Sequence, residues 1–150
     1  LLVAALMTSL YPLAAAFAEA APGPRIHTLS IHPFWLFFTA LGYEMLKDVR
    51  DLPGDEKVQS LNSIARWSRK TWFLPAARLL IVTAAFITLL PYFLGSCKLL
   101  YLAASLTAIL LASLSLRQPP AAAIPYIYAE VFLITLASLA DLLLLVLQSR

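Results

Sequence analysis

Residues 33–55 decide the fold, and they read PFWLFFTALGYEMLKDVRDLPGD. The first half of this stretch is apolar, whereas the second half gathers charge. Five of the chain's eight acidic residues lie in its last part or directly after it, namely Glu44, Asp48, Asp51, Asp55 and Glu56. On a helix, offsets of four, seven and eleven residues place the first four carboxylates on one face, because these spacings nearly complete whole turns. We call these four residues the acidic stripe.

The acidic stripe is suited to hold a divalent cation. Carboxylates on one face repel each other, and hard oxygen ligands of this kind suit Mg²⁺, which binds through a few carboxylates together with substrate phosphates. Pro53 and Gly54 are expected to end the helix and leave Asp55 in the following loop. Lys47 and Arg50 flank the stripe as possible phosphate partners. The alternative is an ordinary solvated helix end, but an apolar helix leading into the charges favours a site.

The composition indicates an integral membrane protein with an all-α fold. The chain is 61% hydrophobic and 13% charged, and its mean hydropathy is +0.83. Apolar runs of about 18 to 25 residues cross a hydrocarbon core of roughly 30 Å as helices. We predict a polytopic bundle in one membrane domain, residues 1–150. Its five spans are expected at residues 1–18, 33–49, 72–94, 98–116 and 121–148.

Other bulk features exclude some functions. The net charge of +3 is too small to suggest a nucleic-acid partner, and the single cysteine, Cys97, excludes an internal disulfide. The chain starts inside an apolar run without Met or a basic leader, so we expect a fragment that lacks its N-terminal part. Residues 56–71 have an amphipathic pattern that ends in three cations. This segment could cover the acidic stripe and carry cations to a diphosphate, or it could serve only as a topology signal.

The distribution of Lys and Arg predicts the orientation. If the Asp48 side faces the cytoplasm, seven cations lie on that side and three on the other, as the positive-inside rule requires. The acidic stripe is therefore expected at the cytoplasmic face of a multi-pass protein. Phe37 falls on the stripe two to three turns deeper, where it could wall an apolar pocket or simply pack between helices.

Three ionisable residues lie inside predicted spans. Such groups usually face a bundle interior and find partners there. Arg78 could reach the acidic stripe or extend to the interface. Glu130 could orient a polar acceptor, although an interhelical hydrogen bond is favoured for it, and also for Asp141.

The stretch from Tyr43 to Asp55 resembles the second aspartate-rich motif of the UbiA superfamily of intramembrane prenyltransferases. Lys47, Asp48, Asp51, Gly54 and Asp55 match that motif residue by residue at the end of an apolar helix. The resemblance implies a nine-helix bundle, of which these spans would be the last five. It also implies transfer of a prenyl group from an isoprenoid diphosphate to an aromatic or lipid-precursor acceptor, within the membrane.

The same resemblance implies a cofactor and site residues. Asp48, Asp51 and Asp55 would be the catalytic Mg²⁺ ligands, and Lys47 would contact the diphosphate, with Tyr43, Glu44 and Arg50 as further candidates for substrate contact. The superfamily's first motif, an Asn followed by spaced Asp residues, is absent. The Thr-Leu-Pro-like continuation is also replaced by Ser-Leu-Asn-Ser-Ile-Ala. This chain alone is therefore expected to be inactive, and the missing N-terminal part is expected to supply the first motif.

Two other classes are considered beside the prenyltransferase. A non-catalytic membrane protein or a transporter could use the acidic stripe to bind a cation. The membrane phosphatidyl-transfer enzymes also use clustered aspartates, but their Asp-Gly start and Ala-Arg pair do not occur in the right arrangement here.

Overall fold

The computed structural model describes Ala5, residues 26–55 and residues 67–148. These parts contain helices and no strand, which confirms the all-α prediction for them. The helices are α2 (Ile26–Asp55), α4 (Phe73–Ile87), α5 (Leu90–Phe93), α6 (Leu99–Ser115) and α7 (Pro120–Gln148). The predicted span 1–18 and most of the amphipathic segment 56–71 lie outside the described residues.

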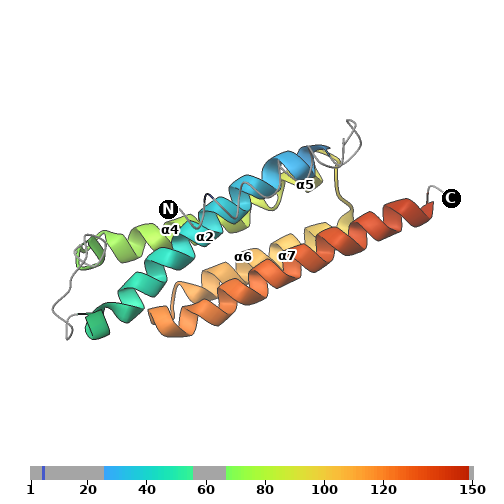
Figure 1. Ribbon diagram of the computed structural model, residues 1–150. Helices are drawn as coiled ribbons and strands as arrows, with labels where there is room; N and C mark the ends of the chain where they lie inside the picture. The colour runs from blue at the N-terminus through green and yellow to red at the C-terminus, as the bar shows by residue number, and fades with distance from the viewer. Residues whose placement is uncertain (1–4, 6–25, 56–66, 149–150) are drawn as a thin grey trace.

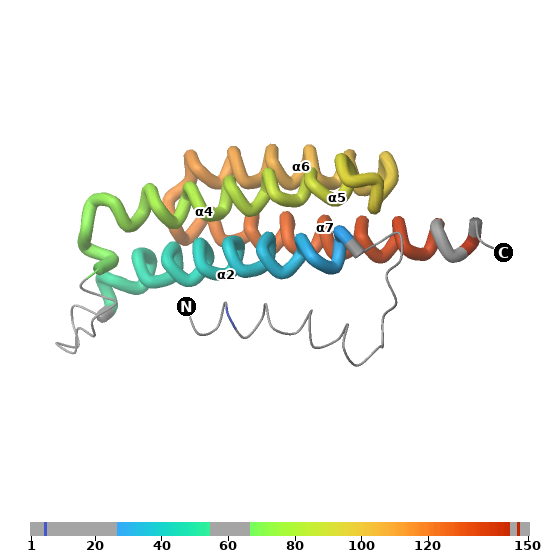
Figure 2. Tube along the Cα trace, turned by 90° about the horizontal axis from the view of Figure 1, so that it is seen from above, coloured from blue at the N-terminus to red at the C-terminus, as the bar shows by residue number. Residues whose placement is uncertain are grey.

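The helices form two antiparallel hairpins that pack against each other. Figure 1 shows α2 running back along α4 and α5, and α6 running back along α7. The most extensive packing is within each hairpin, while α2 against α7 and α4 against α6 join the two. Figure 2 shows the same arrangement from above. The acidic stripe ends up at the end of the bundle where α2 finishes and α4 begins.

Two helical runs of the described residues are long and apolar enough to cross a membrane. They are Phe73–Phe93, which joins α4 to α5, and Pro120–Leu144 within α7; the apolar helix α6 is shorter. These three apolar helical regions coincide with the predicted spans 72–94, 98–116 and 121–148. The five-span topology and the cytoplasmic position of the stripe stay predictions.

Helix α2 differs from the predicted span at both ends. It starts at Ile26 instead of Pro33, and it continues through Pro53 to Asp55. The expectation that Pro53 and Gly54 end the helix and leave Asp55 in a loop was wrong. A proline removes one backbone hydrogen bond, and in the last turn few further bonds depend on it. Gly54 also stays out of the left-handed conformation with which glycine usually ends a helix, since Gly95 is the positive-φ glycine of the described residues.

The predicted span 72–94 is interrupted after Ile87. Pro91 sits in the first turn of α5, and a proline nitrogen cannot donate a hydrogen bond to the preceding helix. The Thr88 hydroxyl donates to the carbonyl of Ala85 at 2.6 Å, where the chain leaves α4. By contrast, α6 and α7 begin and end within one residue of the predicted spans.

Small residues allow the helices to approach closely. On α2 the side that packs into the bundle is a seam of Trp35, Thr39, Gly42 and Leu46, spaced by four, three and four residues. A Cβ atom added to Gly42 would lie 2.7 Å from Ile81 Cγ1 and 2.9 Å from the Ala77 carbonyl oxygen. On α6, Ala104, Ala108 and Ala112 repeat every four residues and are buried. Such small-residue interfaces are typical of membrane helices.

Candidate functional site

The acidic stripe lies on the side of α2 away from its buried seam. Both sets of residues repeat with spacings of four, three and four, and each stripe residue follows its counterpart in the seam by nine positions, which is about two and a half turns, or roughly 180° around the helix. Glu44, Asp48 and Asp51 are accordingly only half-buried. Asp55 is the last residue of α2, and its side chain lies outside the description. Packing of the seam into the bundle thus fixes the position of α2, and α2 presents the stripe on its opposite side.

A cavity of about 570 Å³ opens beside the stripe between α2 and the start of α4. Glu44 and Asp48 contribute its two carboxylates. The rest of the wall is apolar and aromatic: Leu41, Met45, Trp67, Trp72, Phe73, Ala76, Leu79 and Leu80. Its volume falls within the roughly 300 to 1,000 Å³ that is usual for small-molecule sites. The site therefore joins charged oxygen atoms to an apolar chamber.

The aromatic wall of the cavity includes two tryptophans that precede α4. The rings of Trp67 and Trp72 meet edge to face with centroids 5.7 Å apart. Phe37, the aromatic residue expected under the stripe, packs edge to face with Phe38 at 5.7 Å instead and is not among the residues that line the cavity. The residues directly before α4 place both Trp rings beside the α2 residues that line the cavity. A hydropathy pattern does not predict this placement.

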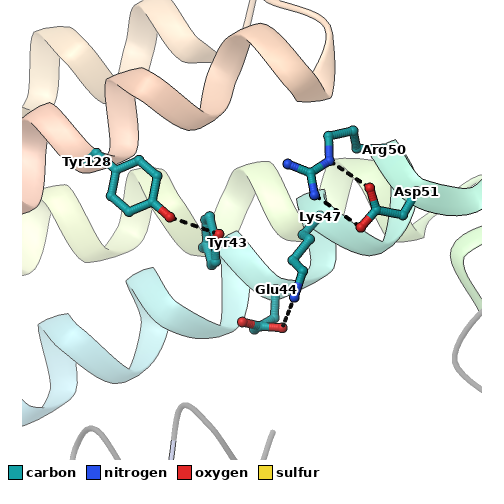
Figure 3. Close-up of polar contacts among 6 residues, drawn as sticks. All are labelled: Tyr43, Glu44, Lys47, Arg50, Asp51 and Tyr128. Carbon is teal, nitrogen blue, oxygen red and sulfur yellow. Dashed lines mark hydrogen bonds and ion pairs between the residues drawn. The ribbon is translucent and has the colours of Figure 1, made fainter.

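The cations predicted for phosphate binding are paired locally with acids of the stripe (Figure 3). Lys47 Nζ lies 3.8 Å from Glu44 Oε2. Arg50 donates from Nε to Asp51 Oδ1 at 2.7 Å and from Nη2 to Oδ2 at 3.1 Å. These hydrogen bonds hold the pKa of Asp51 below its ordinary value and raise the pKa of Arg50. Asp51 is therefore ionised at neutral pH. A metal ion could bind both Asp51 carboxylate oxygens only after the Arg50 side chain had moved away from them.

The predicted metal ligands do not converge within the part of the chain that the structure describes. No group of three or more His, Cys, Asp or Glu side chains there is arranged to hold a metal ion. Asp48 and Asp51 sit one turn apart on the same helix, and the third predicted ligand, Asp55, has no described side chain. The assignment of these residues to Mg²⁺ stays a prediction.

Tyr43 reaches across the bundle to α7. Its hydroxyl is 2.9 Å from the Tyr128 hydroxyl, and the ring centroids are 5.6 Å apart. Figure 3 shows this pair bridging the two helices one turn before Lys47. A small pocket of about 110 Å³ lies beside it, lined by both tyrosines, by Glu44 and by apolar residues of α2 and α7. The sequence did not predict Tyr128 as the partner of Tyr43, because pairing between distant helices leaves no local signal.

The ionisable residues inside the helices have partners away from the stripe. The Glu130 carboxyl accepts a hydrogen bond from Trp35 Nε1 at 3.3 Å, and the Asp141 carboxyl accepts one from the Lys98 backbone N–H at 3.0 Å. Both contacts confirm the expected hydrogen bonds between helical segments. Arg78 donates from Nη2 to the Gln118 carbonyl at 2.9 Å, between α6 and α7, and does not line the stripe cavity.

Comparison with known proteins adds no relative. The chain matches no protein-family model, and no curated protein or solved structure matches it.

Proposed function

We propose that this chain contributes to the active site of a membrane enzyme that transfers a prenyl group from an isoprenoid diphosphate to an acceptor. The observation that carries the proposal is the acidic stripe beside an apolar, aromatic-walled cavity of about 570 Å³. A prenyl diphosphate has the same two parts, a highly charged head and a hydrocarbon tail. The match of residues 43–55 to the second aspartate-rich motif of the UbiA superfamily supports the same substrate.

The residues present fit a magnesium diphosphate in part. Asp48 lines the cavity and Asp51 is ionised at neutral pH, so both can offer carboxylate oxygen to Mg²⁺. A bound ion would neutralise the negative charge of the diphosphate leaving group. Lys47 and Arg50 would exchange their present acidic partners for phosphate oxygens, which bind such cations strongly. The aromatic wall would exclude water from the allylic carbon while the acceptor attacks it.

The test is Mg²⁺-dependent release of pyrophosphate by the full-length protein in membranes. Geranyl, farnesyl and geranylgeranyl diphosphates would be offered with aromatic and glycerol-phosphate acceptors. Asp48→Asn and Asp51→Asn should each lower the rate by at least about 100-fold, as expected for the loss of charge stabilisation in a reaction of this kind. Turnover that is unchanged in both variants would refute the site.

A matched pair of lysines controls for the general effect of charge. Lys47→Gln should reduce turnover, because it removes a cation that flanks the stripe and could contact the diphosphate. Lys98→Gln removes an exposed cation at the other end of the bundle and should leave turnover unchanged. Equal losses in both variants would mean that only the overall charge matters.

A second candidate is a protein without catalysis, in which the stripe only binds a cation or ends a helix. The local pairs of Glu44 with Lys47 and of Asp51 with Arg50 favour it, because they already neutralise two carboxylates. Binding of Mn²⁺, followed by electron paramagnetic resonance, separates the cases. Mn²⁺ binding that Asp48→Asn abolishes, without turnover of any diphosphate, would support a cation site alone.

A further inference from the structure

The strongest unexplained feature is the carboxyl group of Glu130 in the middle of α7. The residue is completely buried, and its one hydrogen bond comes from the Trp35 indole of α2 at 3.3 Å. The second carboxyl oxygen, Oε2, has no hydrogen-bond partner among the described residues. It lies in neither the stripe cavity nor the tyrosine pocket, and the proposed prenyl transfer does not use it.

The charge state of Glu130 follows from what surrounds it. No cation of the described residues forms an ion pair with it. An ionised carboxylate removed from water without a counter-charge is very costly, whereas a neutral carboxyl group is much less so. The indole N–H can donate to Oε1 in either state, so this bond does not require the charge.

The other titratable groups of the packed helices have contacts of their own and do not serve as a counter-charge to Glu130. On α2, His32 meets the Trp35 ring edge to face at 5.5 Å, and its Nδ1 lies 2.9 Å from the Thr28 carbonyl oxygen. A carbonyl can only accept, so Nδ1 carries hydrogen there. On α6, the buried Tyr101 ring lies 6.1 Å from His32. Arg78 of α4 is bonded to Gln118, and Asp141 of α7 accepts from Lys98.

We propose that Glu130 is a proton-binding site in the interior of the bundle, and that the bound proton keeps the two hairpins joined. The Trp35–Glu130 bond links α2 of one hairpin to α7 of the other. With its proton, Glu130 can stay in this dry interface. Without it, the bare charge would draw water between α2 and α7 and separate them. This inference is independent of the proposed prenyl transfer.

Infrared spectroscopy of the protein in lipid vesicles tests the proton directly. At neutral pH the spectrum should contain the carbonyl stretch of a protonated carboxyl group, shifted when H₂O is replaced by D₂O. Glu130→Gln should remove this band, while Glu44→Gln, at a half-buried acid of the stripe, should keep it. Absence of the band at neutral pH, or its persistence in Glu130→Gln, would overturn the proposal.

A second variant guards against misfolding of Glu130→Gln. Trp35→Phe keeps an aromatic ring but removes the N–H donor, so the carbonyl band should move to higher frequency as its hydrogen bond is lost. An unchanged band would show that the protonated acid is not the partner of Trp35. Thermal unfolding adds the structural readout: the wild type should lose stability as the pH rises from acidic values towards neutral, because the unfolded chain releases the Glu130 proton in this range while the folded chain retains it, whereas Glu130→Gln should lack this loss. Equal pH dependence in both would contradict the role of the proton in joining the hairpins.

Discussion

Gly42 lies at a close contact between α2 and α4, where an added Cβ would meet Ile81 and the Ala77 carbonyl oxygen. We expect Gly42→Ala to destabilise the fold by about 1 to 3 kcal/mol, because the new Cβ would meet the Ala77 carbonyl oxygen at 2.9 Å, and backbone cannot yield as a side chain does. Gly54→Ala is the matched control: nothing lies within 4 Å of its Cβ position, and alanine favours a helix over glycine by roughly 0.5 to 1 kcal/mol. Thermal unfolding in detergent measures both. A neutral Gly42→Ala would show that the helices are not in such close contact.

The Arg50–Asp51 pair should be visible in a titration. The pKa of Asp51 is depressed in the folded chain, so the pair stabilises the fold above the ordinary aspartate pKa, and this contribution is lost as the pH falls through the depressed value. Arg50→Gln should raise the pKa of Asp51 towards its ordinary value. The carboxyl ¹³C chemical shift of Asp51 reports it. The side chains of Arg50 and Asp51 are 38% and 42% exposed, so solvent screens the pair and global stability should change little. An unmoved titration midpoint of Asp51 would contradict the pair.

At the scale of the element, Asp141 anchors the start of α6. Its carboxyl accepts from the N–H of Lys98, the residue that precedes the first turn, where unpaired donors and the helix dipole attract negative charge. We expect Asp141→Ala to cost about 1 to 2 kcal/mol of stability, as the loss of a helix cap does.

Lys98→Gln supplies the control for this anchor, because the hydrogen bond uses the backbone of Lys98 and not its side chain. It should leave the melting temperature nearly unchanged. If Lys98→Gln destabilises as much as Asp141→Ala does, the contact is an ion pair between side chains and not a cap.

Helix boundaries also show what hydropathy can and cannot predict. The ends of α6 and α7 coincide with changes from apolar to polar composition and with the Pro119–Pro120 pair, so the sequence located them within one residue. The predicted end of α2 was wrong. Pro53 and Gly54 are residue types that often end a helix, but nothing steric requires α2 to end at them. The division between α4 and α5 was missed because apolar residues continue through it.

At the scale of the whole molecule, the sequence predicted the helical class but not the long-range pairs. The acidic stripe follows from local spacing, which a helix preserves. Tyr43 with Tyr128, and Trp35 with Glu130, are brought together only when the two hairpins pack, and neither pair has a periodic signal. The aromatic wall of the cavity depends in the same way on how the segment before α4 lies over α2.

Because the seam and the stripe lie on opposite sides of α2, the two faces of this helix can evolve under different constraints. Substitutions at Trp35, Thr39, Gly42 or Leu46 act on folding, whereas substitutions at Glu44, Asp48 or Asp51 touch a face that folding scarcely uses. In a saturation-mutagenesis library, cellular abundance should therefore be lost every three or four residues along α2, with the stripe positions tolerated in between. A single helix can in this way keep its architecture constant while the chemistry on its other face drifts.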